Sequence, residues 1–131
     1  MKETFGKNEK LKSKKLISQL FADGKSITAF PLKVIYFQLP ESKSHPVLDE
    51  SSLIQVGVSV PKKKFRKAVQ RIHLKRLMRE AYRKNKYLVY EKNPTPYAFM
   101  FLYLGKERMD YHKITAAMKN LLQRLVSKEF Q

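Results

Sequence analysis

Apolar residues recur along this chain with two periods, one typical of helices and one typical of strands. Residues 8–22 carry apolar side chains at helical spacing, and Asp23 and Gly24 then predict the end of a first helix. A short strand is expected at residues 26–28. Residues 30–39 predict a longer strand because they are rich in branched and aromatic side chains, with Pro31 near its start.

The second half of the chain continues this alternation of strands and helices. Polar residues 40–52 predict a surface loop, and residues 54–60 then alternate between an apolar face and a face of small or polar residues. A long helix is expected from residue 64 or 65 to about residue 90, ended by the proline-containing residues 93–96. Residues 97–104 are apolar on both faces, as in a central strand. Asp110 is the expected N-cap of a last helix, whose apolar stripe spans residues 114–126.

The order of these elements, α-β-β-β-α-β-α, predicts an α+β fold. We expect a single α/β sandwich of about four mixed strands with three helices, which leaves one face of the sheet accessible. The 131 residues form one domain that is large enough to bury a core. Residues 1–7 and 129–131 are expected to be frayed ends.

The long helix combines a buried stripe with a strongly basic surface. Its apolar residues fall within an arc of about 100° on a helical wheel: Leu74, Leu77, Met78, Ala81 and Leu88. Between residues 62 and 86, twelve Lys or Arg residues accompany a single acid, Glu80. A merely solvated face normally mixes signs, because like charges four residues apart repel. With a net charge of +17 on the whole chain, this pattern indicates a nucleic-acid-binding surface.

Composition argues against a protein active site and against a membrane protein. The chain has no cysteine, only four glycines, and no GxSxG sequence. Its three histidines (His45, His73 and His112) have no metal-ligand spacing, so we expect no catalytic and no metal-binding residues. No run of 18 apolar residues exists, and the N-terminal residues are charged. We therefore expect a soluble, cytoplasmic protein, with a basic membrane-surface protein as a weaker interpretation.

Residues 56–82 carry a recognisable combination of motifs. The strand VGVSVPKK is followed, after a short gap, by the helix pattern R-x-x-x-K-R-L-x-R-E-A-Y. Together they resemble the bacterial ribonuclease P protein component, and the similarity extends over about residues 8–126. The resemblance implies a subunit that assists a catalytic RNA in removing the 5′ leader of precursor tRNA. The endoribonuclease would then be the ribonucleoprotein, and Mg²⁺ would be required by the RNA partner, with no cofactor on the protein.

The resemblance also assigns roles to individual residues. The partners would be the catalytic RNA and precursor tRNA, with no DNA and no membrane. Contacts to the catalytic RNA are expected from Lys62, Lys63, Lys67, Arg71, Lys75, Arg76, Arg79 and Arg83. A cleft for the single-stranded leader is expected to contain Ile17, Phe21, Tyr36, Gly57 and Ser59. The last two leave room for a base, and the aromatic rings can stack on one. The family fold implies in addition a left-handed βαβ crossover.

One motif departs from the family, and other functions remain open. The family's RNR reads Arg71-Ile72-His73 here, so an apolar Ile72 stands within the basic arc. Ile72 either packs beside a neighbour or contacts an RNA sugar or base, and a neutral His73 cannot replace a guanidinium. A ribosomal or other structured-RNA-binding protein is the main alternative function. A DNA-binding regulator is a third, although no short helix and turn precede the basic helix.

Overall fold

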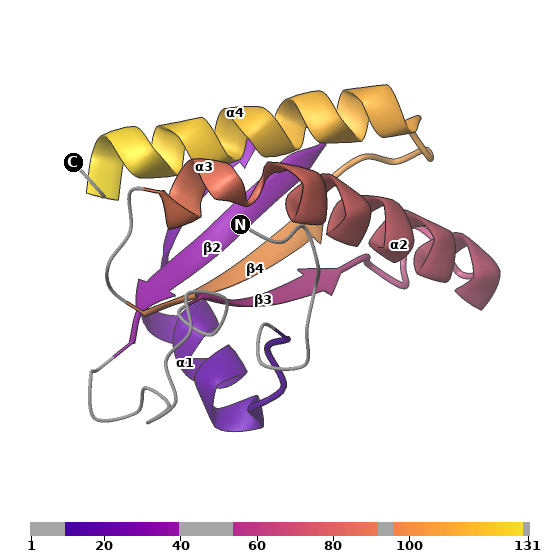
Figure 1. Cartoon of the computed structure of the whole chain (residues 1–131). Coiled ribbons are helices and arrows are strands. Elements are labelled where there is room, and N and C mark those ends of the chain that lie inside the picture. The colour runs from indigo at the N-terminus through magenta and orange to yellow at the C-terminus, as the bar shows by residue number, and fades with distance from the viewer. Residues whose placement is uncertain (1–9, 40–53, 92–95, 130–131) are drawn as a thin grey trace.

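A four-stranded sheet in the order β1-β2-β4-β3 divides the molecule into two helical layers (Figure 1). The computed structural model describes residues 10–39, 54–91 and 96–129. The strands are β1 (Lys25–Ala29), β2 (Leu32–Gln38), β3 (Ile54–Ser59) and β4 (Tyr97–Tyr103). β2 pairs antiparallel with both β1 and β4, whereas β3 pairs parallel with β4. The predicted α+β fold with about four mixed strands is confirmed.

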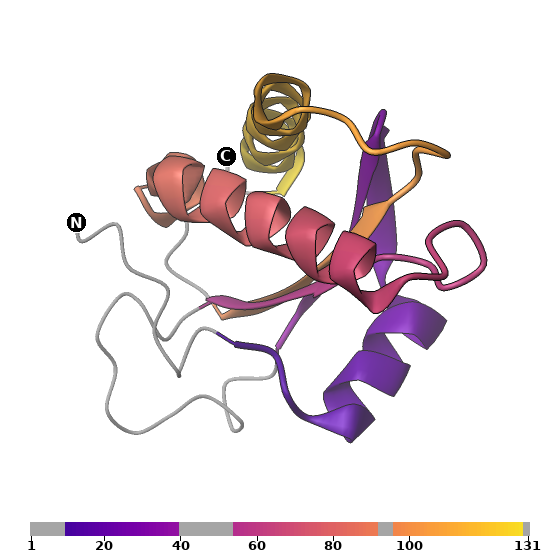
Figure 2. The same ribbon diagram turned by 90° about the vertical axis from the view of Figure 1, so that its right-hand side faces the viewer.

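The helices lie on opposite faces of this sheet (Figure 1, Figure 2). They are α1 (Lys14–Asp23), α2 (Ala68–Asn85), α3 (Tyr87–Tyr90) and α4 (Tyr111–Glu129). Helices α2, α3 and α4 cover one face, and α1 packs on the other, against β2 and β4. The Asp110 cap of α4 is present, because its carboxylate Oδ1 accepts a hydrogen bond from the Lys113 backbone N–H at 3.0 Å.

The sheet separates two apolar clusters. The larger one lies between the sheet and α2, α3 and α4, and it includes Tyr82, Phe99 and Phe101. The smaller one lies beneath α1 and includes Leu20 and Met100. Because neighbouring residues of β4 contribute to both clusters, this strand is buried on both faces, as its sequence predicts.

The first helix begins later than predicted, at Lys14 and not near residue 8. The Ser13 hydroxyl accepts a hydrogen bond from the Leu16 backbone N–H at 3.2 Å, so Ser13 caps the helix. Lys10 and Leu11, which precede the helix, lie along the edge of β3, where the Leu11 N–H donates to the Val56 carbonyl at 3.0 Å. An N-terminal segment expected in the helix therefore extends the sheet edge.

The long basic helix also begins later than predicted, at Ala68. Lys67 has extended backbone angles (φ −78°, ψ 127°). Arg71 explains the delay, because its Nη1 donates to the carbonyls of Phe65 and Arg66 at 2.8 and 2.9 Å and holds them outside the helix. At the other end Lys86 keeps helical angles, so α3 carries the helical path to Tyr90, close to the predicted end.

The connection from β3 through α2 and α3 to β4 joins two adjacent parallel strands and is the expected βαβ crossover. Its left-handed sense stays a prediction of the family resemblance. The predicted loop at 40–52 and the ends at 1–7 and 130–131, which were expected to be frayed, lie outside the described residues. Glu129, which was also expected to be frayed, instead ends α4 and accepts a hydrogen bond from Tyr36 at 2.9 Å.

Burial of the α2 stripe should dominate the stability of this layer. Leu74 is fully buried, so Leu74→Ala should lower the free energy of unfolding by about 2–5 kcal/mol through lost contacts and a new cavity. Ile72 on the same helix is exposed, so Ile72→Ala should change the free energy of unfolding by less than about 0.5 kcal/mol. Urea unfolding of the two variants measures both values. Equal losses of stability in the two variants would show that α2 does not bury the Leu74 side and expose the Ile72 side.

Candidate nucleic-acid interface

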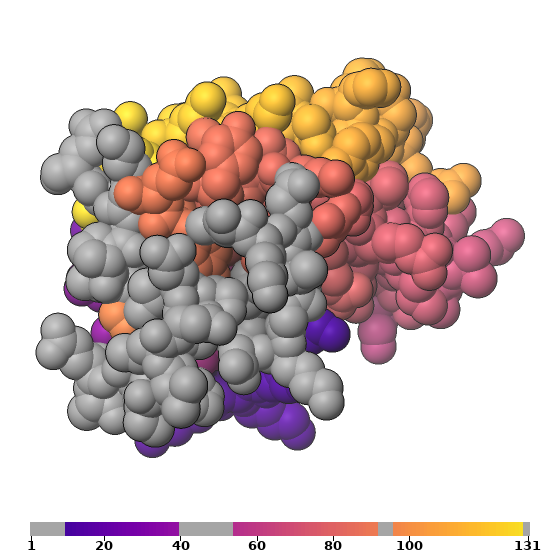
Figure 3. All heavy atoms as spheres, viewed as in Figure 1, coloured from indigo at the N-terminus to yellow at the C-terminus, as the bar shows by residue number. Residues whose placement is uncertain are grey.

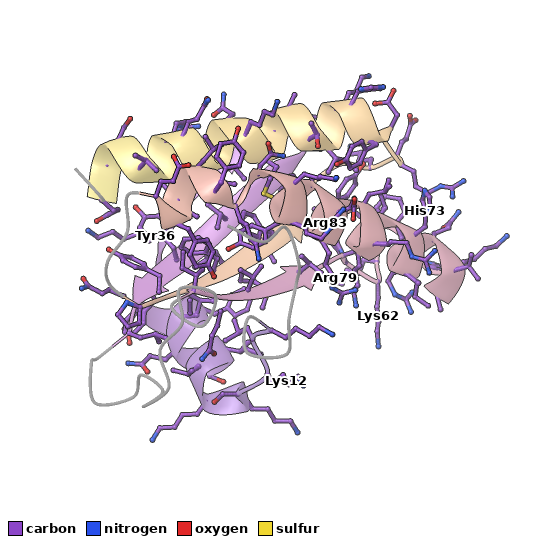
Figure 4. All side chains as sticks on the ribbon, in the orientation of Figure 1. Lys12, Tyr36, Lys62, His73, Arg79 and Arg83 are labelled. Carbon is purple, nitrogen blue, oxygen red and sulfur yellow. The ribbon has the colours of Figure 1, made fainter. Side chains whose placement is uncertain are left out.

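Three consecutive lysines follow β3 in the turn that leads to α2. Lys62, Lys63 and Lys64 are all exposed. Lys64 donates through Nζ to the Leu104 carbonyl at 2.9 Å, which ties the turn to the end of β4. Lys62 therefore extends from an anchored turn, next to the start of the basic helix (Figure 4).

The buried stripe of α2 determines which of its cations reach solvent. With Leu74, Met78 and Ala81 in the core, Arg76 and Arg79 lie on the exposed side and Lys75 is half-buried. Within the described residues, no acidic side chain forms an ion pair with Arg76 or Arg79. In the space-filling view, atoms of α2 project at the right-hand end of the molecule (Figure 3). Two guanidinium groups are thus available to an anionic partner.

Arg83 differs from these two because α2's one acid neutralises it. Its Nε and Nη2 donate to the two oxygens of Glu80 at 3.0 and 2.5 Å. The Arg83 hydrogen bond lowers the pKa of Glu80 below its usual value, so this carboxylate stays charged. Arg71 is also engaged, by the carbonyls of Phe65 and Arg66. We therefore distinguish exposed cations that can bind a partner from cations that organise the site.

Two lysines that the sequence analysis did not assign join this surface. Lys10 and Lys12 flank Leu11 in the segment along β3, and together they line a hollow of about 320 Å³, which we call the edge hollow. Val56, Gly57 and Arg79 line its other side. The sequence could have indicated their position, because Lys10, Leu11 and Lys12 alternate between polar and apolar as in a strand, just before the serine that caps the helix.

A second hollow adjoins the first and shares Lys10 and Arg79 with it. This helix hollow is lined by Lys10, Ile72, Arg76, Arg79, Glu80 and Arg83. The two hollows therefore connect the exposed side of α2 with the sheet face that α1 partly covers. In Figure 4, Arg79 extends from the side of α2 toward α1, whereas His73 extends from the other side.

The eight predicted RNA-contacting cations thus belong to two consecutive segments. Lys62, Lys63 and Lys67 lie in the turn and at the N-cap of α2, and the other five lie on α2. Arg76, Arg79 and Arg83 meet around the helix hollow. Their contact with RNA stays a prediction.

The five residues predicted to form a leader cleft are not all on one face of the sheet. Ile17 packs in the cluster beneath α1, and Phe21 at the end of α1 is 51% exposed. Gly57 and Ser59 lie on the same sheet face. Met100 packs directly against Gly57, because a Cβ there would come within 2.8 Å of the Met100 methyl carbon, and Gly57 also lines the edge hollow.

Tyr36 is on the opposite face, so its placement in a cleft with Ile17 and Phe21 is wrong. It is 4% exposed, belongs to the larger cluster, and donates its hydroxyl proton to Glu129 Oε1 at 2.9 Å. Burial, followed by this hydrogen bond and the Glu129 charge, raises the pKa of Tyr36 to about 12. Lys25 pairs with the same carboxylate at 3.4 Å. Tyr36 therefore fastens the end of α4 to the sheet.

The described part of the chain holds no group of three or more His, Asp or Glu side chains that could bind a metal ion. None of its helices is long and apolar enough to cross a membrane. The features that stand out are therefore the exposed cations around the two hollows. This arrangement defines the chain as a basic α+β domain of the class that binds polyanions.

Comparison with known proteins identifies the family. The model of the family described as Ribonuclease P matches residues 5–126, and the chain belongs to this family. It is 38% identical over 127 residues to the ribonuclease P protein component of Porphyromonas gingivalis strain W83, covering 93% of this chain and 88% of that protein. The recognised resemblance is confirmed.

Solved structures agree with this assignment. The ribonuclease P protein from Thermotoga maritima superposes with a TM-score of 0.68 at 26% identity, covering 88% of this chain and 96% of the other. The ribonuclease P protein from Staphylococcus aureus gives a TM-score of 0.68 at 18% identity, covering 94% and 98%. At that identity the second match supports the fold alone.

Tyr36→Phe tests the assigned role of this hydroxyl. Losing the hydrogen bond to Glu129 should destabilise the protein by about 0.5–1.5 kcal/mol at neutral pH. Because folding raises the pKa of Tyr36 from 10.0 to about 12, the contribution of its hydroxyl is fully present below pH 10 and is lost as the pH rises through 12. The stability difference between parent and variant should therefore shrink over that interval.

Denaturant unfolding at a series of pH values from neutral to 12 measures the difference in free energy of unfolding between the parent and Tyr36→Phe. The matched control is Tyr87→Phe, which removes the hydroxyl of an exposed tyrosine that takes no part in this hydrogen bond. A parent-to-variant difference that stays constant across the interval would contradict the assignment.

Proposed function

We propose that this chain is the protein subunit of ribonuclease P. In this role it binds the catalytic RNA and the 5′ leader of precursor tRNA and assists endonucleolytic 5′ maturation of tRNA. Family membership over residues 5–126 supports the proposal. The observation that carries it is the exposed side of α2, where Arg76 and Arg79 face solvent and form no ion pair within the described residues.

The proposed contribution of the protein is electrostatic. Cleavage brings a precursor tRNA against a folded catalytic RNA, and the phosphates of the two molecules repel each other. Lysine and arginine side chains on α2 and in the turn before it would neutralise phosphates and release condensed counterions. The bond-breaking step would be carried out by the RNA with its Mg²⁺. The same function places the protein in the cytoplasm with its RNA partners.

Leader binding would use the sheet face on the α1 side. Phe21 presents an exposed ring there, and base stacking on an aromatic side chain contributes about 1–3 kcal/mol with little dependence on base identity. Ile17, Gly57 and Ser59 belong to the same face and can border the leader. Tyr36 is left out of this proposal because its ring and hydroxyl are used within the fold.

The direct test of the proposed function is reconstitution of precursor tRNA cleavage. The purified protein is combined with the catalytic RNA of Porphyromonas gingivalis at low Mg²⁺. We expect it to stimulate release of the 5′ leader, because protein cations replace part of the missing metal charge, and to release none without the RNA. Cleavage by the protein alone, or no stimulation at any Mg²⁺ concentration, would contradict the proposal.

The salt dependence of RNA binding tests the two exposed arginines. Replacing Arg76 and Arg79 together by Ala should weaken binding of the catalytic RNA. It should also reduce the slope of log K against log salt by about one unit per lost phosphate contact. The matched control replaces Lys119 and Lys128, two exposed lysines of α4, and should keep the slope of the parent. Equal slopes for all three proteins would show that Arg76 and Arg79 do not contact phosphates.

A further inference from the structure

The helix hollow contains an apolar side chain that the fold does not use. Ile72 is 56% exposed and belongs to neither apolar cluster of the described residues. It lines the hollow together with Lys10, Arg76 and Arg79. Ile72 was expected either to pack beside a neighbour or to contact RNA. Among the described residues, it does not pack into an apolar cluster.

We propose that the helix hollow binds one unpaired nucleotide of RNA. The base of this nucleotide lies against Ile72, and Lys10, Arg76 and Arg79 bind its flanking phosphates. The proposal deepens the proposed function and rests on it for the identity of the RNA. It also gives a role to Ile72, one of the two residues at which this chain departs from the RNR motif of the family resemblance.

The size of the hollow favours a single nucleotide. Its volume of about 310 Å³ is at the lower end of ligand pockets, which hold about 300–1,000 Å³. A stacked duplex keeps its base faces covered, so it offers no base face to an isoleucine. A base that has left its stack exposes an apolar face, and sequence-specific proteins bind RNA mainly through such bases.

The charges around the hollow favour a phosphate-bearing ligand. Within the described residues, Arg76 and Arg79 have no acidic partner, and the exposed Lys10 lines the same hollow. Among the described residues that line the hollow, Glu80 is the one acid, and Arg83 holds it at 3.0 Å. Lys10, Arg76 and Arg79 thus leave positive charge in the hollow that Ile72 also lines.

Affinity measurements with two probes test the apolar contact. A short oligouridylate supplies unpaired nucleotides, and an RNA duplex of mixed sequence supplies none. Ile72→Ala should weaken oligouridylate binding by about threefold to tenfold, which corresponds to losing part of the burial of an isoleucine. Because the lost group is uncharged, the salt slope should not change. Duplex binding should not change either.

Two matched variants separate the site from general effects. Val69 lies on the same helix, is 75% exposed, and does not line the hollow. Val69→Ala should therefore bind oligouridylate with the affinity of the parent. Ile72→Leu keeps the apolar surface and should retain most of the affinity, whereas Ile72→Asn should lose it as the alanine variant does. Thermal unfolding of each variant confirms that it is folded.

Isoleucine methyl NMR on the parent protein locates the contact. Oligouridylate should shift the Ile72 methyl signal, and the duplex should shift it much less. Ile114, fully buried in the larger cluster, is the internal reference, and Ile17 reports separately on the sheet face near α1.

Three results would overturn the proposal: unchanged affinity in Ile72→Ala, equal losses in Ile72→Ala and Val69→Ala, or an Ile72 signal that responds equally to duplex and oligouridylate. The proposed function fails separately. If Ile72 responds as expected but the protein does not stimulate precursor tRNA cleavage, the nucleotide site stands and the ribonuclease P role is wrong. If cleavage is stimulated and Ile72 does not respond, the role stands and the site is wrong.

Discussion

Packing of α2 against the sheet is the interaction on which the candidate interface depends. Leu74, Met78 and Ala81 are fully buried, and together they fix the rotation of the helix about its own axis. Because an α-helix turns by about 100° per residue, that one constraint also fixes the direction of every cation on the helix. Arg76 and Arg79 are exposed for this reason, and the same core that stabilises the domain presents its charge.

The edge of β3 provides the second half of the interface. The Leu11 N–H donates to the Val56 carbonyl at 3.0 Å, so Lys10 and Lys12 lie along a strand whose next element is α2. Cations far apart in the sequence thereby meet at Arg79, which lines both hollows. A protein that must hold a flexible polyanion gains from such an arrangement, because positions fixed by backbone hydrogen bonds lose little entropy on binding.

Periodicity predicted the elements that depend on local pattern. The strand at residues 54–60, the central strand and the apolar stripes of the last two helices follow from the positions of their own side chains. The face of Tyr36 could not be predicted in this way. β2 has apolar residues on both of its faces, so the alternation of apolar and polar residues does not show which face packs against α1 and which against the other helices. Only the pairing of Tyr36 with Phe99 of β4 places its ring in the larger cluster.

The number of basic residues in a sequence overestimates the number of cations that can bind a partner, because some of them are bound within the fold. Eight cations were assigned to RNA, yet Arg71 donates to two backbone carbonyls and Arg83 is bound by Glu80. A guanidinium satisfied within the fold must give up those bonds before it can bind a phosphate bidentately, and that exchange offsets much of the gain. Such internal partners are set by tertiary contacts and by the exact start of α2, which composition does not encode. The counterions released on RNA binding should therefore follow the number of exposed, unengaged cations, and fall short of the formal charge of the basic segment.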